Sequence, residues 1–126
     1  MITGVGTDVV DIDRFRTLNR RADFLRQVFT PSEIRNAPGQ PAQATFFATL
    51  FAIKEALLKA LGCGLAEGSL WRDIHITPDW KTELSGHLGR LAQDQSISTI
   101  HVSHSHSDNS AVAFVILETT NAEEIV

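Results

Sequence analysis

The chain has 126 residues, the size of one domain with a single hydrophobic core, so we expect residues 1–126 to form one domain whose acidic tail, residues 119–126, can fray. Apolar residues make up 43% and charged residues 21% of the chain, which excludes a disordered or fibrous protein. The formal net charge of -4 argues against a general nucleic-acid binder.

The first residues lack a basic region followed by an apolar run, and no stretch approaches about 18 uninterrupted apolar residues. This pattern predicts neither export nor insertion into a membrane. The single cysteine, Cys63, cannot form an intrachain disulfide, which fits a reducing compartment. We therefore expect a cytoplasmic protein.

The first predicted element is a strand over residues 2–10, which are rich in Val, Ile and Thr. Gly4 and Gly6 limit the bulk on the face that also carries Asp8, so we expect Asp8 to project into open space. Asp11 is typical of the start of a short helix, because an acid is favourable at a helix N-terminus.

A basic segment extends from Arg14 to Arg26. Five arginines against the single acid Asp23 give this segment a charge of +4 and leave -8 for the rest of the chain. Two interpretations stay open for it: a solvated loop and helix face, or a docking site that attracts an acidic macromolecule.

Another helix start is predicted at residues 29–33. Thr30 has the properties of an N-cap, Pro31 those of a first helical residue, and Glu33 those of the reciprocal partner in a capping box. This short helix should end before Pro38.

The central predicted element is a helix of about five turns over residues 43–61, a stretch without Pro or Gly. Apolar side chains cover most of its surface, which indicates that it is buried. Its three charged residues, Lys54, Glu55 and Lys59, therefore stand out, since charges in such surroundings are paired or hold a ligand.

The rest of the chain favours strands, predicted over residues 70–77, 80–84, 97–105 and 110–118, with a short helix over residues 86–95. Ser107-Asp108-Asn109 predicts a β-hairpin between the last two strands, and the unbroken apolar run 111–117 is typical of a central strand. The expected fold class is α+β, with the long helix packed on an antiparallel sheet.

A phosphoryl-transfer site can be assembled from these elements. Glu55 and Lys59 are four residues apart on one helical face, which fits either an ion pair along the helix or a shared ligand. Glu55 and Asp8 can each supply an oxygen to Mg2+, whose remaining ligands are waters and substrate phosphates. Lys59 then neutralises the same phosphates.

Read in order, three segments resemble the acyl-carrier-protein synthase group of 4'-phosphopantetheinyl transferases: Gly4-Val5-Gly6-Thr7-Asp8-Val9-Val10-Asp11-Ile12, Phe29-Thr30-x-x-Glu33 and Phe51-Ala52-x-Lys54-Glu55-Ala56-x-x-Lys59-Ala60-Leu61-Gly62. A family-like Ser103-His104-Ser105-His106 follows near the end, so the resemblance spans roughly residues 2–118. One position departs from the family, which commonly has a basic residue where this chain has Leu50.

The resemblance implies a Mg2+-dependent holo-[acyl-carrier-protein] synthase that moves 4'-phosphopantetheine from coenzyme A to a serine of an apo acyl carrier protein. It implies a role in lipid metabolism, as in fatty acid biosynthesis, and usually a homotrimer with clefts between subunits. The implied catalytic residues are Asp8, Glu55 and Lys59, and the first two bind the metal. The implied coenzyme A contacts are Lys59, Ser105 and His106; the carrier-protein contacts are Arg14, Arg21 and Arg26.

Two alternatives remain at this point. The first is a non-catalytic module that binds coenzyme A or a nucleotide and serves as an assembly subunit. The second is a zinc site, because His104, His106 and Asp108 point the same way from one strand. Trp71 and Trp80 are expected to be packing residues.

Overall fold

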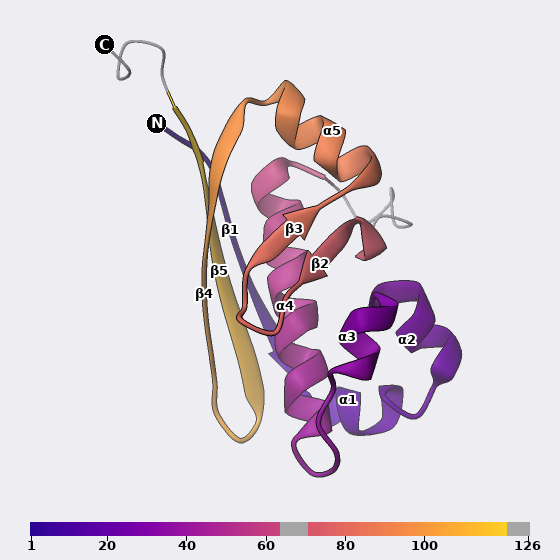
Figure 1. Cartoon of the computed structure of the whole chain (residues 1–126). Helices are drawn as coiled ribbons and strands as arrows, with labels where there is room; N and C mark the ends of the chain where they lie inside the picture. The colour runs from indigo at the N-terminus through magenta and orange to yellow at the C-terminus, as the bar shows by residue number, and fades with distance from the viewer. Residues whose placement is uncertain (64–70, 121–126) are drawn as a thin grey trace.

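The computed structural model describes residues 1–63 and 71–120. The elements follow one another as β1 (Ile2–Asp11), α1 (Ile12–Leu18), α2 (Ala22–Val28), α3 (Pro31–Arg35), α4 (Gln43–Leu61), the 3-10 helix η2 (Trp71–Asp73), β2 (Ile74–Ile76), β3 (Thr82–Leu84), α5 (Gly86–Asp94), β4 (Ile97–His106) and β5 (Ser110–Thr119). Figure 1 shows the long helix α4 between a three-stranded sheet and the smaller elements. The α+β fold class is confirmed.

The main sheet is antiparallel, with the strand order β1-β5-β4. Its middle strand is β5, as the apolar run predicts: its inward side chains are fully buried. The predicted hairpin joins β4 to β5, and Ser107 Oγ accepts hydrogen bonds from the backbone N–H groups of Asn109 and Ser110 at 3.2 and 3.1 Å.

Helix α4 has the bounds that the sequence predicts, and it ends at Gly62, whose φ of 81° is left-handed. The helix packs on β1 and β5. A β-carbon at Gly4 or Gly6 would overlap the backbone oxygen of Ala60 or Ala56, respectively. The two glycines therefore let the helix backbone lie directly against the first strand.

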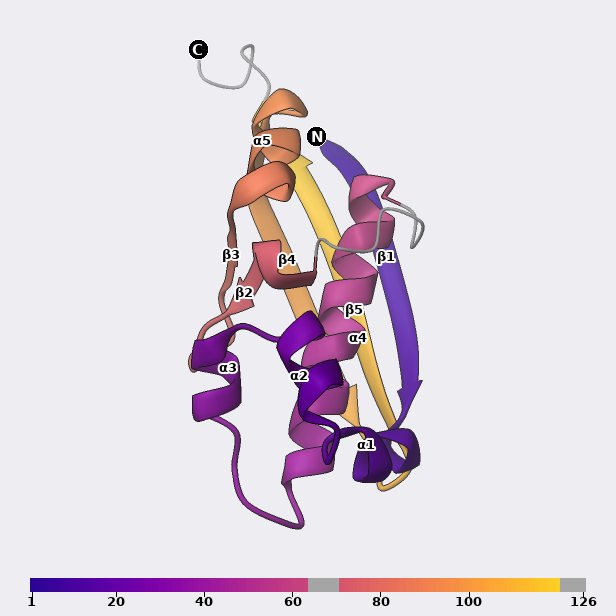
Figure 2. The same cartoon turned by 90° about the vertical axis from the view of Figure 1, so that its right-hand side faces the viewer.

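The opposite side of α4 is covered by α1, α2, α3 and the small sheet of β2 and β3 (Figures 1 and 2). The capping box is formed, since Glu33 N donates to Thr30 Oγ1 and Thr30 N donates to Glu33 Oε1 at 3.2 and 2.9 Å. Buried aromatic rings from these elements join the core beneath α4.

Some expectations about the elements were wrong. Residues 71–73 form a 3-10 helix and the strand covers only Ile74–Ile76, while Leu70 lies outside the described residues. The next strand begins at Thr82, because Trp80 has a φ of 65° that no strand accommodates. Helix α2 was not anticipated, since its N-cap, Arg21, makes no side-chain capping bond.

The tail expected to fray spans residues 119–126. Thr119 ends β5, and residues 121–126 lie outside the described part of the chain. Across residues 1–63 and 71–120, no helix has the length and apolar character needed to cross a membrane.

Candidate active site

Asp8 lies on the side of β1 that α4 covers. Gly6 and Val10 face the same way and are buried, whereas Val5 and Val9 on the other side are exposed. The Asp8 side chain is only 11% exposed. The expectation that Asp8 projects into open space is therefore wrong: the backbone of α4 fills the space beside Gly4 and Gly6, and the helix lies next to the carboxylate.

Glu55 lies beside Asp8 on the flank of α4. Burial raises the pKa of Glu55 to about 7, reinforced by the charge of Asp8 and a hydrogen bond with it. The positive charges of Lys59 and Arg14 act in the opposite direction. The strand and the helix thus bring together a pair of carboxyl groups, Asp8 and Glu55, and Glu55 is poised to gain or lose a proton near neutral pH.

Lys59 completes the group, in an arrangement that the sequence left open. Its Nζ donates to Asp8 Oδ1 at 2.9 Å and to the backbone oxygen of Thr7 at 3.0 Å. Lys59 therefore forms its ion pair with the strand and not with Glu55 along the helix. Its side chain is 54% exposed, so its ammonium group remains open to a ligand.

The carboxylate pair fits a hard divalent cation. Asp8 Oδ2 is buried and accepts no hydrogen bond from a donor of the described residues. Only the protonated form of Glu55 could donate to Asp8, so the oxygen has no donor when both carboxyl groups are ionised. A cation between two such carboxylates would satisfy this oxygen and relieve their repulsion. No group of three or more His, Cys, Asp or Glu suited to a metal exists within residues 1–63 and 71–120. Two carboxylates suit Mg2+, which keeps waters and takes phosphates, better than a metal held by protein alone.

The basic segment reaches this site through Arg14. Helix α1 begins directly after β1, with Asp11 as its N-cap, and its residue Arg14 is exposed but close enough to lower the pKa of Glu55. Arg21 and Arg26 are exposed as well. Arg21 forms a 3.4 Å ion pair with Asp23, which is solvent-exposed and weak.

The two other expected coenzyme A contacts, Ser105 and His106, lie on β4 at the opposite edge of the sheet from β1. In register across β5, Asp8 aligns with Ala113, and Ala113 aligns with His104. Two strand spacings put Asp8 and His104 about 10 Å apart at their backbones. His106 borders residues of the first two turns of α4, whereas Lys59 lies in its last turn, so one chain does not bring Lys59 and His106 together.

A cavity of about 360 Å³ lies beside these histidines. Its lining residues are Pro38, Ala42, Thr45, Phe46, Thr49, Trp80, His104 and His106. The rings of Trp80 and His104 pack with centroids 4.3 Å apart, and burial followed by the charge of His106 lowers the pKa of His104. Trp80 thus lines a cavity besides packing, whereas Trp71 is a buried packing residue as expected.

The zinc alternative is not supported. His104, His106 and Asp108 belong to the described part of the chain, and they form no metal-binding group there. Leu50, at the position where the family commonly has a basic residue, is 1% exposed. It therefore contributes to the core and offers nothing to an anion.

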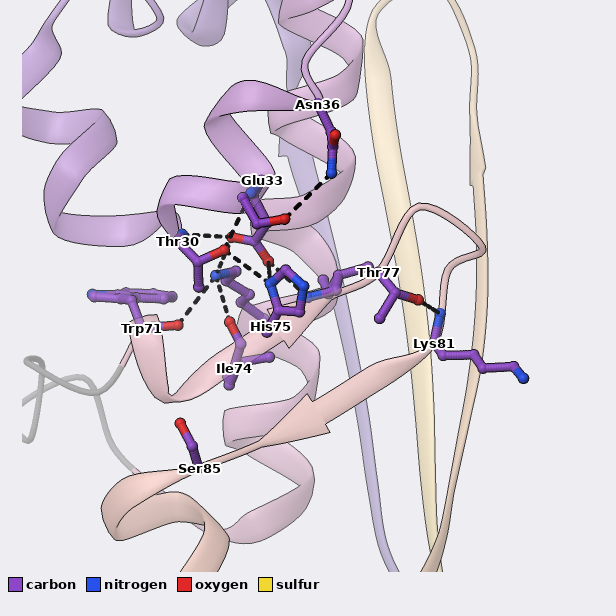
Figure 3. Close-up of polar contacts among 12 residues, drawn as sticks. Thr30, Glu33, Asn36, Trp71, Ile74, His75, Thr77, Lys81 and Ser85 are labelled. Carbon is purple, nitrogen blue, oxygen red and sulfur yellow. Dashed lines mark hydrogen bonds and ion pairs between the residues drawn. The ribbon is translucent and has the colours of Figure 1, made fainter.

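Sequence reasoning missed a buried lysine network next to the site, which we define as Lys54, Glu33 and the backbone groups they bind. Lys54 Nζ donates to Glu33 Oε1 at 2.8 Å, and both side chains are 0% exposed. Three backbone oxygens also accept from Lys54 Nζ: Ile74 at 2.8 Å, Val28 at 3.0 Å and Trp71 at 3.2 Å. Figure 3 shows Glu33, Trp71 and Ile74 converging on this point.

The buried lysine network ties α3, α4 and the η2–β2 segment together. Glu33 Oε2 also accepts from the N–H of Ile76 at 2.7 Å, so that this carboxylate serves the capping box and the network at once. Burial lowers the pKa of Lys54, and the charge of Glu33 opposes that effect. Because Lys54 precedes Glu55, the network also fixes the rotation of α4 that turns Glu55 towards Asp8.

Comparisons with known proteins agree with this geometry. Residues 4–115 match the model of the 4'-phosphopantetheinyl transferase superfamily. A holo-[acyl-carrier-protein] synthase of Geotalea daltonii is 42% identical over 124 residues, covering 94% of this chain and 99% of the relative. The crystal structure of the corresponding Neisseria meningitidis enzyme superimposes with a TM-score of 0.82 at 31% identity, covering 94% of this chain and 100% of that one. The structure of a Bacillus anthracis holo-(acyl-carrier-protein) synthase in complex with CoA (3',5'-ADP) superimposes with a TM-score of 0.75 at 29% identity, covering 95% of this chain and 99% of that one.

Proposed function

Because this chain belongs to the 4'-phosphopantetheinyl transferase superfamily, we propose that it acts as a holo-[acyl-carrier-protein] synthase. It transfers 4'-phosphopantetheine from coenzyme A to a serine of an apo acyl carrier protein and releases 3',5'-ADP. The observation that carries the proposal is the carboxylate pair, in which Asp8 has a buried oxygen without a hydrogen-bond partner and Glu55 has a pKa of about 7.

Asp8 and Glu55 would hold a Mg2+ ion, which supplies charge neutralisation for the pyrophosphate when bound. Lys59 adds a second positive charge on the same side of the site. Its contact with Asp8 Oδ1 keeps the ammonium group at the carboxylate pair while leaving it half exposed. The residues of this site thus match a doubly charged, oxygen-rich substrate.

In the transfer, the serine oxygen attacks the β-phosphorus of coenzyme A, and the bond between this phosphorus and the bridging oxygen of the α-phosphate breaks. Glu55 takes the proton of the serine hydroxyl, directly or through a water that it holds. Lys59 stabilises the negative charge that develops on the departing 3',5'-ADP.

The nucleotide end of coenzyme A is assigned to the cavity beside Trp80, with His106 and Ser105 as its contacts. The apolar lining and the Trp80 and His104 rings suit a flat base. This cavity and the carboxylate pair lie at opposite edges of one sheet, so we propose that the cavity of one subunit faces the carboxylate pair of a neighbour.

A homotrimer of this kind needs a face for self-association. The side of the sheet away from α4 carries four exposed apolar side chains, which we call the outer face: Val5 (51% exposed), Val9 (66%), Val112 (38%) and Phe114 (42%). Such a contiguous apolar surface is typical of an interface. Its location on β1 and β5 supports the proposed trimer.

The carrier protein is proposed to dock on Arg14, Arg21 and Arg26. The influence of Arg14 on Glu55 supports this, since a protein held there would present its serine close to the carboxylate pair. With its single cysteine, Cys63, the enzyme is proposed to act in the cytoplasm on carriers of lipid metabolism such as fatty acid biosynthesis.

The test is mass spectrometry of apo acyl carrier protein after incubation with the protein, coenzyme A and Mg2+. We expect a mass gain of one phosphopantetheine that EDTA abolishes. Glu55→Gln should lose the gain with its circular dichroism unchanged, whereas the control Glu83→Gln, on an exposed residue of β3, should retain it. Coenzyme A binding without any mass gain would support the non-catalytic module instead.

A further inference from the structure

A second hollow, away from the cavity beside Trp80, is bordered by three arginines. It has a volume of about 360 Å³ and is lined by Arg26, Phe29, Pro31, Ile34, Arg35 and Arg72. The arginines come from three elements, α2, α3 and η2, and all three are exposed. We call this feature the arginine hollow.

The charges of the arginine hollow are not compensated. Within the described part of the chain, no ion pair or hydrogen bond involves the side chain of Arg26, Arg35 or Arg72, and no acidic residue lines the hollow. Arg16 and Arg21, by contrast, each pair with an aspartate. On a chain of net charge -4, three free guanidinium groups around one hollow make a local positive potential.

The floor of the hollow is apolar. Phe29 is fully buried beneath it, and Pro31 and Ile34 form its walls. A free inorganic anion gains nothing from such a floor, because it would lose hydration without an apolar body to bury. The combination favours an occupant that carries both acidic groups and an apolar side chain, as an amphipathic acidic segment of a protein does.

The arginine hollow is connected to the flank of α4 that carries Glu55 through Trp71. Phe51 is one helical turn before Glu55, and its ring stacks on Trp71 with centroids 5.0 Å apart. Arg72 directly follows Trp71. Figure 2 shows α2 in front of α4, with α3 to its left and α1 below it. A macromolecule docked at Arg14 can therefore extend over Trp71 to the hollow.

We propose that the arginine hollow is a second docking point for the apo acyl carrier protein, with Arg35 and Arg72 joining Arg26 around an acidic segment whose apolar side chain enters the hollow. This rests on the proposed function. It widens the docking surface from the basic segment on α1 and α2, which the sequence indicates, to α3 and η2. Contact at two separated points would set the orientation of the carrier on the enzyme and would also strengthen its binding.

The experiment measures binding of apo carrier by calorimetry and transfer by steady-state kinetics for Arg35→Glu, Arg72→Glu and the double variant. We expect the Kd and KM for the carrier to rise about 3- to 10-fold for each single change and further for the double, more strongly at low salt. The kcat at saturating carrier and the KM for coenzyme A should stay unchanged. Arg90→Glu, an exposed arginine of α5, is the matched control, and Arg14→Glu the positive control.

A Kd for the carrier that is unchanged in the double variant, while Arg14→Glu weakens binding, would overturn the proposal. A change confined to the KM for coenzyme A would overturn it as well and would assign the arginine hollow to a small phosphorylated ligand. Because carrier binding is measured directly, weaker binding by the variants supports the arginine hollow as a docking point even if the wild-type protein transfers no phosphopantetheine. The absence of transfer would count only against the proposed function.

Discussion

Lys54→Met tests the buried lysine network most directly. Methionine has nearly the length and volume of lysine and keeps the packing of α4, but it removes the ammonium group. Glu33 would then remain as a buried carboxylate without its counter-charge. The backbone oxygens of Val28, Trp71 and Ile74 would lose a donor at the same time.

The expected cost follows from these contacts. Removing one partner of a fully buried ion pair costs about 3–5 kcal/mol, because the remaining charge is left uncompensated. The 0% exposure of both Lys54 and Glu33 and the contact of 2.8 Å place this pair in that class. Since a domain is stable by only about 5–15 kcal/mol, the variant should be close to its folding limit.

The assay is urea unfolding followed by circular dichroism, at one fixed protein concentration because self-association affects apparent stability. The matched control is Lys81→Met. Lys81 is 80% exposed, and its ion pair with Asp79 is long, at 3.7 Å. The loss of this exposed pair should cost less than about 1 kcal/mol. If Lys54→Met unfolds at the same urea concentration as Lys81→Met, the reasoning about the network is wrong.

Two further predictions concern the carboxylate pair and the outer face. The raised pKa of Glu55, about 7 against an ordinary 4.5, means that the metal-free folded protein binds this proton more tightly than the unfolded chain does. Stability in EDTA should therefore fall as the pH rises from about 4.5 to about 7, and Glu55→Gln should remove this part of the slope in urea melts; an equal slope in both proteins would contradict the assignment. Phe114→Arg on the outer face should convert a trimer into monomers in light scattering with circular dichroism unchanged, and a monomeric wild-type protein would refute the proposed trimer.

Local signals in the sequence were sufficient for several elements. The capping box at Thr30 and Glu33 and the helix over residues 43–61 follow from short-range hydrogen bonding and from the positions of Pro and Gly, and both formed as predicted. Helix α2 carries no such signal. Its seven residues depend on Phe24, whose ring packs against Phe15 and Phe51 from other elements.

The sequence by itself singled out Asp8, Glu55 and Lys59 as candidate site residues, because the spacing of the charges on an apolar helix and the glycines before Asp8 are both local patterns. Only the tertiary structure decided their partners. Lys59 pairs with a residue 51 positions away, and Lys54 with one 21 positions away. Such pairs depend on how helices and strands pack, since a buried charge takes whichever acceptor the fold brings to it.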